Sequence, residues 1–322
     1  MKTFYWLVKR EFWENRGGFL WAPVVTGVVF LVLNIMAIIA AEVVGARHGF
    51  NIGGNNLQEL IAKADAGDMQ QIGAGLDIVM ISAMGLISFV TGIVVLFYCL
   101  GALYDDRRDR SVLFWKSLPI SNTSTVLSKV VSAVVLAPVI AVVVGIVIGL
   151  VHLVIVTLVL SLHGVNVWQL LTLAHPFRAV GSLLSSIPLY ALWAAPAVGW
   201  LMLCSAWARS KPFLWAVAMP VVAGLMVTWF GIMGVFNLPA QWFWVNIVAR
   251  LLFSVFPGTQ LVANPHAYTA SIDLGDAHNP LALLSPLHTY TALASPDLWI
   301  GVAAGAALIA GAIWFRRVRD DS

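Results

Sequence analysis

Six apolar segments, each long enough to cross a lipid bilayer as a helix, constrain the fold of this chain more than any other feature of its sequence. A hydrocarbon core of about 30 Å needs about 20 apolar residues at a helical rise of about 1.5 Å per residue. The segments of this length cover approximately residues 19–44, 76–104, 130–162, 183–207, 213–236 and 298–315. Because backbone polar groups in lipid must be satisfied within the chain, the sequence predicts an all-α membrane protein with six transmembrane helices.

The overall composition supports lipid as the main solvent of this chain. Apolar residues make up 60% of the sequence and charged residues only 10%, whereas a typical soluble domain has about 25% charged residues. The first segment is much longer than the about 7–15 apolar residues of a signal peptide, so we expect an uncleaved helix. Cys99 and Cys204 lie inside apolar segments, and we expect both to be small buried hydrophobic residues and not disulfide or zinc partners.

The distribution of basic residues orients the six helices. With six crossings both termini lie on one side of the membrane, and all but four of the 18 Lys and Arg residues fall on that side. The exceptions are Arg47, Lys63, Arg178 and Arg250. By the positive-inside rule we expect both termini in the cytoplasm and the chain in a bacterial inner (plasma) membrane.

Two flanking regions are expected to lie at the membrane surface. Residues 1–17 combine aromatic and basic side chains and predict an interfacial helix, although Glu11 intrudes on its apolar arc. Residues 242–256 are apolar but too short for a crossing and contain Arg250, so they predict a re-entrant or interfacial helix within the extracytoplasmic loop of residues 237–297. The prolines of this loop indicate turns or short helices, and we expect it to cap a pathway.

Two features of the predicted helices leave alternatives open. The segment of residues 130–162 is too long for one straight crossing, so it is expected to tilt, to kink at Pro138, or to project beyond the bilayer. Two pairs of glycines have the spacing that permits close helix contact, and this spacing fits packing within the chain and packing against a second subunit equally well. These pairs are Gly145 with Gly149 and Gly301 with Gly305.

The cytoplasmic segment of residues 105–129 is the most distinctive part of the sequence. It begins with alternating charges from Asp105 to Arg110, continues with the apolar cluster Val112–Trp115, and breaks at Pro119. An exposed aromatic cluster framed by charge suits the docking of a soluble protein, because aromatic side chains provide burial and a charged rim sets the register. The charged run alone fits a solvated helix start equally well, since exposed ion pairs contribute only about 0–1 kcal/mol.

This segment resembles the permeases of the ATP-binding-cassette (ABC) type-2 exporter family. The resemblance rests on Arg108–Leu113 (RDRSVL) and Ser117–Ser121 (SLPIS) at matching spacing, and on Lys129 at the start of the third helix. The chain also has the family's order of an interfacial helix, six crossings and an outer re-entrant element before the last crossing. Ser111 and Phe114 depart from the family pattern, which commonly has Gly and an acidic residue there, so the contacts of those two positions are not carried over.

The resemblance implies that residues 1–322 form one transmembrane domain, the permease subunit of an exporter. Its cytoplasmic segment would bind an ABC ATPase subunit that holds ATP and Mg, and a second permease copy or a homologue would complete the complex in membrane lipid. No nucleic acid partner is expected. The cargo is expected to be lipid-like, an amphipathic peptide or a hydrophobic drug, moved outward. The residues expected at the ATPase-coupling interface are Asp106, Arg108, Asp109, Arg110, Leu113, Phe114, Trp115, Lys116, Leu118 and Pro119.

No catalytic, cofactor or metal site is expected in the chain itself. The sequence contains neither a GxxxxGK[ST] phosphate loop nor an HExxH zinc motif. His152 is the only histidine inside a predicted crossing and has no second histidine there to hold a haem. Glu42 and Asp77 are expected at the outer ends of crossings, which disfavours an ion-coupled carrier. An intramembrane enzyme acting on lipid or peptide and a non-transporting anchor or sensor subunit are the alternative functions.

Overall fold

The predicted all-α class with six membrane helices is confirmed. The computed structural model describes residues 2–47, 66–109, 121–163, 166–234, 239–259 and 290–319. Every regular element within these residues is a helix, and six helical runs are long and apolar enough to cross a membrane. These runs are Gly17–Val44, Gly67–Arg108, Asn122–Leu162, Leu170–Trp207, Pro212–Ile232 and Pro296–Val318.

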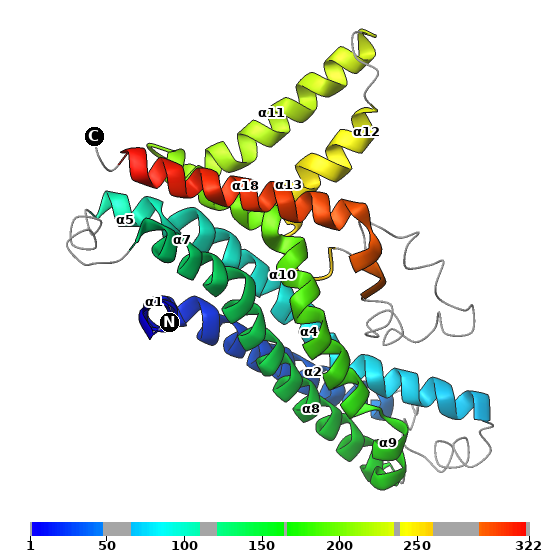
Figure 1. Ribbon diagram of the computed structural model, residues 1–322. Coiled ribbons are helices and arrows are strands. Elements are labelled where there is room, and N and C mark those ends of the chain that lie inside the picture. Colours follow the sequence, from blue (N-terminus) through cyan, green and yellow to red (C-terminus); the bar gives the residue numbers. More distant parts are fainter. Residues whose placement is uncertain are drawn as a thin grey trace.

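Long helices lying side by side form the body of the molecule (Figure 1). The four longest elements of this bundle are α2 (Ala22–Arg47), α4 (Ala66–Ala102), α8 (Ala137–Leu162) and α10 (Pro176–Trp207). Helix α18 (Pro296–Arg319) packs along α10. Both ends of the chain lie at the same end of the bundle, which we call the termini end, and α9 (Val167–Leu173) lies at the opposite, far end (Figure 1).

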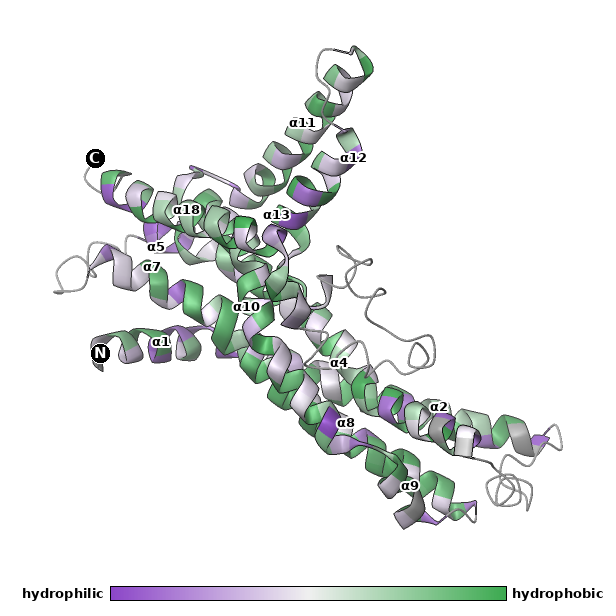
Figure 2. Cartoon of the chain, turned by 45° about the vertical axis from the view of Figure 1, so that its right-hand side comes forward, coloured by the Kyte–Doolittle hydropathy of each residue, from purple (hydrophilic) through white to green (hydrophobic). Residues whose placement is uncertain are grey.

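Hydrophilic residues gather at the termini end, as Figure 2 shows for α1 (Lys2–Glu14), α5 (Tyr104–Arg108) and the end of α18. Helix α1 corresponds to the predicted interfacial helix. Its Trp6 and Trp13 are exposed, whereas Leu7 and Glu11 are buried. One face of α1 is therefore packed against the protein, and it contacts α7 (Asn122–Val131).

The third membrane run, for which the sequence left tilt, a kink at Pro138 and projection open, is one continuous helix. Helix α7, a π-helical segment η2 (Ser132–Leu136) and α8 follow one another without a break to Leu162. The π-helical segment directly precedes Pro138, which lacks an N–H and would clash with the carbonyl one turn before it in a regular helix. The run has 41 residues and is about 60 Å long at about 1.5 Å per residue. It therefore projects well beyond the hydrocarbon core or crosses it with a strong tilt.

A helical hairpin projects from the bundle (Figure 1). Its first arm is α11 (Pro212–Ile232), and its second arm is an uninterrupted run of α12 (Ala240–Phe243), η3 (Trp244–Ala249) and α13 (Arg250–Phe253). The second arm is too short to cross a bilayer, in agreement with the prediction of a re-entrant or interfacial helix. The Trp244 indole donates a hydrogen bond to Thr228 Oγ1 at 3.0 Å and thereby fixes the two arms together. Residues 237–238 and 260–289 of the predicted 237–297 loop lie outside the described residues.

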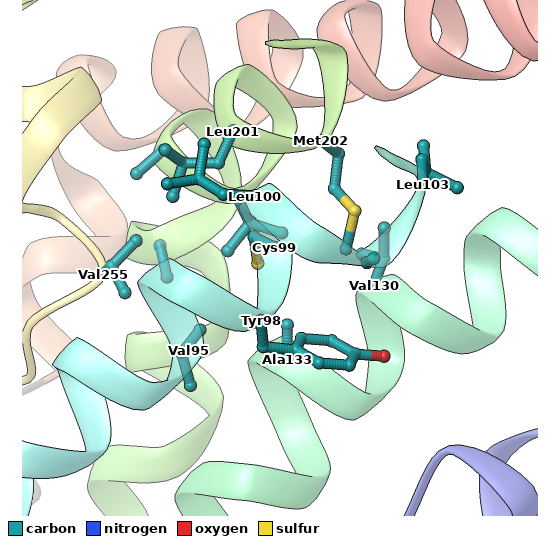
Figure 3. Packing of buried hydrophobic residues seen from close by; sticks show 14 of the residues in the cluster. Val95, Tyr98, Cys99, Leu100, Leu103, Val130, Ala133, Leu201, Met202 and Val255 are labelled. Carbon is teal, nitrogen blue, oxygen red and sulfur yellow. The ribbon is translucent and has the colours of Figure 1, made fainter. Parts of the chain in front are cut away.

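A cluster of buried hydrophobic residues holds the bundle together near the termini end (Figure 3). It joins α4 to η2 and α10, with Cys99 and Met202 completely buried. Both Cys99 and Cys204 are buried and unpaired, as predicted. The hydroxyl of Tyr98 points out of this cluster toward the blue N-terminal part of the chain (Figure 3).

Both glycine pairs serve packing within the chain. A methyl group on Gly149 would collide with the carbonyl oxygen of Met80 on α4, and one on Gly145 would collide with Met84. A methyl group on Gly305 would meet the backbone of Ala195 on α10 at 2.6 Å. The small residues thus let α8 approach α4, and α18 approach α10, to backbone contact.

Two polar side chains at the far end are buried between helices. Asp77, which was expected at the outer end of its crossing, is buried and accepts a hydrogen bond at 2.9 Å from the backbone N–H of His175, the residue before α10. His152 also makes its contact between helices, with Nδ1 2.9 Å from the carbonyl oxygen of Val79 on α4. Hydrogen bonds within the protein thus accompany the burial of both side chains.

Candidate functional site

A buried cluster of charged side chains lies at the termini end, where α1, α5, α7 and α18 meet. We define this ion cluster as Glu11, Asp106, Lys129 and Arg316 with the hydroxyl of Tyr98. The side chains of Glu11, Lys129 and Arg316 are 1%, 4% and 5% exposed. Charged side chains are rarely buried to this degree unless they are paired, so the pairing geometry determines what the cluster can do.

Lys129 is the central cation of the ion cluster. Its Nζ lies 3.2 Å from Glu11 Oε1 and 3.5 Å from Asp106 Oδ2. Arg316 Nη1 lies 3.5 Å from the same Asp106 oxygen, and the Tyr98 hydroxyl donates to Glu11 Oε2 at 2.9 Å. Two carboxylates thus face two cations, and the charges of the cluster balance.

The ion cluster links elements that are far apart in the sequence. Glu11 comes from the N-terminal helix α1, Asp106 from α5, Lys129 from α7 and Arg316 from the end of α18. Removing one partner of a buried ion pair typically costs about 3–5 kcal/mol, whereas keeping the whole set intact contributes little net stability. The ion cluster therefore fixes the positions of α1, α5, α7 and the end of α18 relative to one another. Movement of any one of these helices would separate its ion pairs.

Arg10 and Glu14 extend the ion cluster toward solvent. Arg10 Nη2 lies 2.8 Å from Glu11 Oε1, and its Nε lies 3.1 Å from Glu14 Oε1. Partial burial raises the pKa of the Glu14 carboxyl, and the Arg10 guanidinium opposes that rise. Glu11 is consequently surrounded by cations on two sides, from its own helix and from α7.

Ser205 on α10 fixes the junction between α4 and α5. Its Oγ accepts hydrogen bonds from the backbone N–H groups of Leu103 and Tyr104 at 3.0 and 2.9 Å. Arg107 then donates to the carbonyl oxygens of Ser205 at 2.6 Å and Ala208 at 3.0 Å. The last carbonyls of α10 are satisfied by this guanidinium, so α5 is held rigidly against the end of α10.

The predicted ATPase-coupling segment begins and ends beside the ion cluster. Asp109 forms the C-cap of α5, and Ser121 forms the N-cap of α7, with its side chain accepting from the backbone N–H of Ser124 at 3.1 Å. Asp106 is the second residue of the segment (residues 105–129) and Lys129 is its last, and these two side chains are in contact. The two ends of the segment are therefore brought together by the same ion pair.

The predicted interface residues divide into three groups. Asp106 belongs to the ion cluster, while Arg108 and Asp109 are exposed at the end of α5. The remaining seven lie outside the described residues, namely Arg110, Leu113, Phe114, Trp115, Lys116, Leu118 and Pro119.

Sequence reasoning missed Glu11 and Arg316 as members of a site. The signal for Glu11 was present, since an acidic residue interrupts the apolar arc of α1 and is the residue of that arc that the structure buries. The signal for Arg316 was weaker. It follows the buried Ala312 by one helical turn and continues its face, whereas the neighbouring Arg317 is exposed.

A cavity of about 480 Å³ adjoins the ion cluster. Its walls come from α1, the π-helical segment Gly17–Trp21, α4, α5 and α7, and include Glu11, Phe19, Tyr98, Asp106 and Lys129. A cavity beside charged groups gives them room to rearrange and to be hydrated when they separate. Within the described residues no group of three or more His, Cys, Asp or Glu side chains is placed to hold a metal ion. No family model, curated protein or solved structure matches this chain.

Proposed function

We propose that this chain is the membrane-spanning permease subunit of an ABC exporter. A separate cytoplasmic ATPase subunit hydrolyses ATP, and the permease moves a lipid-like, amphipathic peptide or hydrophobic drug cargo outward. The termini end is then the cytoplasmic end. The observation that supports this proposal best is the contact of Asp106 with Lys129, at 3.5 Å, which joins the two ends of the segment that resembles the coupling segment of type-2 exporters.

The position of this ion pair suggests how a partner would act on the membrane helices. A soluble subunit that binds the residues between Asp109 and Ser121 acts on two ends that lead into long helices. On one side these are α5 and α4, and on the other side they are α7, η2 and α8. Movement of the segment therefore reaches the far end through rigid helices and not through side chains alone.

To switch between two conformations, the binding of the partner subunits must supply at least the free energy that stabilises the starting conformation. A shift of a two-state equilibrium from about 1:99 to about 99:1 requires about 5.5 kcal/mol of differential binding. Disrupting a buried ion cluster costs about 3–5 kcal/mol, which is the same order. The ion cluster accordingly serves as the latch of one state, and ATP-dependent closure of the partner subunits supplies the differential affinity that opens it.

A second permease copy or a homologue completes the complex in this proposal. Helices α2 and α11 support it, because both are apolar and largely exposed along their lengths. Part of that surface faces lipid, and part is available to the second subunit.

The decisive experiment is to purify the tagged full-length chain from its native host in mild detergent without crosslinking. We expect a stoichiometric ATPase subunit to co-elute, and its ATP turnover to fall when Lys129→Gln opens the ion cluster. Arg317→Gln is the matched control, since Arg317 is a neighbouring but exposed cation. If the tagged chain elutes without any ATPase subunit, the proposal is contradicted. Hydrolysis of lipid or peptide by the purified chain alone would favour an intramembrane enzyme. Co-elution of an ATPase whose ATP turnover is unchanged in the Lys129→Gln variant would favour an anchor or sensor subunit.

A further inference from the structure

A second, larger cavity lies away from the ion cluster. Its volume is about 780 Å³, and its walls come from α4, α10, η3, α13 and the start of α18. Most of the wall is aromatic or aliphatic, including Phe89, Val245, Phe253 and Phe256, and the main cationic group in it is Arg250. A cavity of this size whose wall is apolar apart from one cation, Arg250, one anion, Asp297, and a few neutral polar groups is suited to an amphiphile that has a long apolar part.

The cavity is separated from the ion cluster along the helices. Phe89 and Trp193 line it, and Gly301 contacts the Arg250 side chain beside it. Each lies about 13 to 15 residues from the point where its own helix ends or reaches the ion cluster, which is about 20 Å at a rise of about 1.5 Å per residue. The cavity and the ion cluster are therefore two distinct sites.

A cation–π contact and close packing hold the Arg250 side chain in place. Its guanidinium lies over the ring of Trp193, with Cζ 4.6 Å from the ring centroid. On another side it lies so close to α18 that a methyl group on Gly301 would come within 2.6 Å of Cζ. Its Nε and Nη2 are buried and have no hydrogen-bond partner in the described part of the chain.

Unsatisfied buried donors of this kind are unusual in proteins and require an explanation. Cation–π contact with Trp193 orients the guanidinium but accepts no N–H. Asp297 also lines the cavity and attracts Arg250 electrostatically, yet its carboxylate does not reach the two buried nitrogens. These two nitrogens face α18 at Gly301, so the cavity offers a ligand the charge of the guanidinium and not these two donors, and an oxyanion is the group that matches this charge best.

The residues after α13, which form one wall of the cavity, are fixed by hydrogen bonds and ring stacking. The Tyr190 hydroxyl donates to the carbonyl oxygen of Val255 at 2.7 Å, and the Trp193 indole donates to Thr259 Oγ1 at 3.2 Å. Phe256 stacks on Phe89 with ring centroids 5.6 Å apart. The loop after α13 is thus fixed to α10 and α4, and the cavity keeps its shape without a ligand.

We propose that this cavity binds an amphiphile with a single negative charge, whose oxyanion is held by Arg250 and whose alkyl chain lies along Phe89, Phe253 and Phe256. Asp297 limits the charge of the headgroup, because a second negative charge would be placed near its carboxylate. The role of this ligand as an exported cargo rests on the proposed function, whereas its binding does not. A lipid of the membrane and a free amphiphilic molecule share this chemistry.

The test uses two photoreactive probes that differ by one methyl group and one charge. The first is a diazirine-bearing hexadecyl methyl phosphate, which is an anion, and the second is the corresponding hexadecyl dimethyl phosphate, which is neutral. The full-length chain is reconstituted in phosphatidylcholine nanodiscs and illuminated, and labelled peptides are mapped by mass spectrometry. We expect saturable labelling of residues 245–259 by the anionic probe only, and competition by unlabelled dodecyl methyl phosphate, which carries one negative charge, but not by inorganic phosphate.

Three variants and one control test which charged side chain is responsible for binding the anionic probe. Arg250→Gln should reduce labelling about tenfold, since it removes a charge-assisted contact, and Arg250→Lys should retain part of it. Asp297→Asn should increase labelling by removing the competing carboxylate. Arg178→Gln is the control, because Arg178 is an exposed arginine near the far end, and its labelling should equal that of the wild type.

Equal labelling of residues 245–259 by the anionic and neutral probes would overturn the proposal, and this comparison needs no variant to fold. Competition by inorganic phosphate as strong as that by dodecyl methyl phosphate would overturn it as well, because the site would then bind a free anion and not an amphiphile. A lipid source is distinguished by displacement of the probe when the nanodiscs contain phosphatidylglycerol. Labelling requires neither ATP nor a partner subunit, so its failure and the failure of the exporter proposal are separate results.

Discussion

Lys129 Nζ lies 3.2 Å from Glu11 Oε1, across 118 residues of sequence, in a site where both side chains are almost completely buried. This contact ties the N-terminal helix α1 to the helix that follows the predicted coupling segment. A surface helix that only rested on the membrane would not need to place a carboxylate inward. Helix α1 is therefore a structural part of the switch that we propose at the termini end, and its acidic residue can be tested directly.

Glu11→Gln should destabilise the folded protein strongly, whereas Glu14→Gln should not. Replacing Glu11 leaves the buried Lys129 without its closest carboxylate, and removing one partner of a buried pair costs about 3–5 kcal/mol. Glu14 lies three residues later on the same helix, but half of its side chain is exposed. Thermal unfolding in detergent, followed by fluorescence-detected size exclusion, compares the two. Equal loss of stability in both variants would contradict the special role of Glu11.

Combining Glu11→Gln with Lys129→Met should restore part of the stability that each change removes alone. The reason is that the double variant no longer leaves an uncompensated charge in the interior, and apolar groups often replace buried ion pairs without loss. Residues in direct contact typically show interaction energies of about 0.5–3 kcal/mol in such a cycle. The four proteins of the cycle are compared by the same thermal assay. Strictly additive losses would mean that the two side chains do not interact.

The restored double variant should still be impaired in ATP turnover with its partner subunit. Stability and switching depend on different properties of the ion cluster, since an apolar replacement cannot be opened and closed by a change in hydration. ATP hydrolysis of the complex from the native host measures this separation. Normal turnover in a stable double variant would show that the ion cluster has no part in switching.

The fold was predictable to the extent that it depends on hydropathy and length. Apolar length alone identified all six crossings, and a short apolar stretch with a central arginine correctly indicated an element that does not cross. The start of α4 at Ala66 was not predicted, because residues before Leu76 include Asp68 and Gln71 and are not apolar enough to count toward a crossing. Their helix is formed by continuation of α4 beyond the membrane and by its contacts with α9.

The candidate site was less predictable, because it depends on tertiary contacts that no local pattern contains. The sequence drew attention to the charges of residues 105–110, yet only Asp106 of that run belongs to the ion cluster. Two other members of the ion cluster, Glu11 and Arg316, come from opposite ends of the chain. Arg250 presents the same difficulty, since its contacts with Trp193 and Gly301 arise from packing of α13 against α10 and α18. A charge within an apolar helix is a useful signal, but its partners are known only from the fold.

Trp115→Ala and Leu113→Asp should abolish the stimulation of ATPase activity while leaving membrane insertion intact. Both residues belong to the apolar cluster that the sequence predicts as the anchor for the partner subunit, and buried aromatic anchors often contribute about 2 kcal/mol or more to binding. Trp168→Ala is the matched control, because Trp168 is an exposed tryptophan on α9 at the far end. Co-purification and ATP turnover are measured for each variant. Unchanged complex formation in both test variants would remove the docking role of the segment.

Gly305→Ala should destabilise the protein, and Gly181→Ala should leave it unchanged or slightly more stable. Both glycines lie within helices, so alanine gains about 0.5–1 kcal/mol from helix propensity in either case. At Gly305 the added methyl group would meet the backbone of Ala195 at 2.6 Å, where no side chain can move aside, while at Gly181 no atom lies within 4 Å. The contact between α18 and α10 would have to open, which also displaces Arg316 from the ion cluster. Gly305→Ala should therefore lower both the unfolding temperature and ATP turnover, and the absence of any effect would mean that α18 can shift freely along α10.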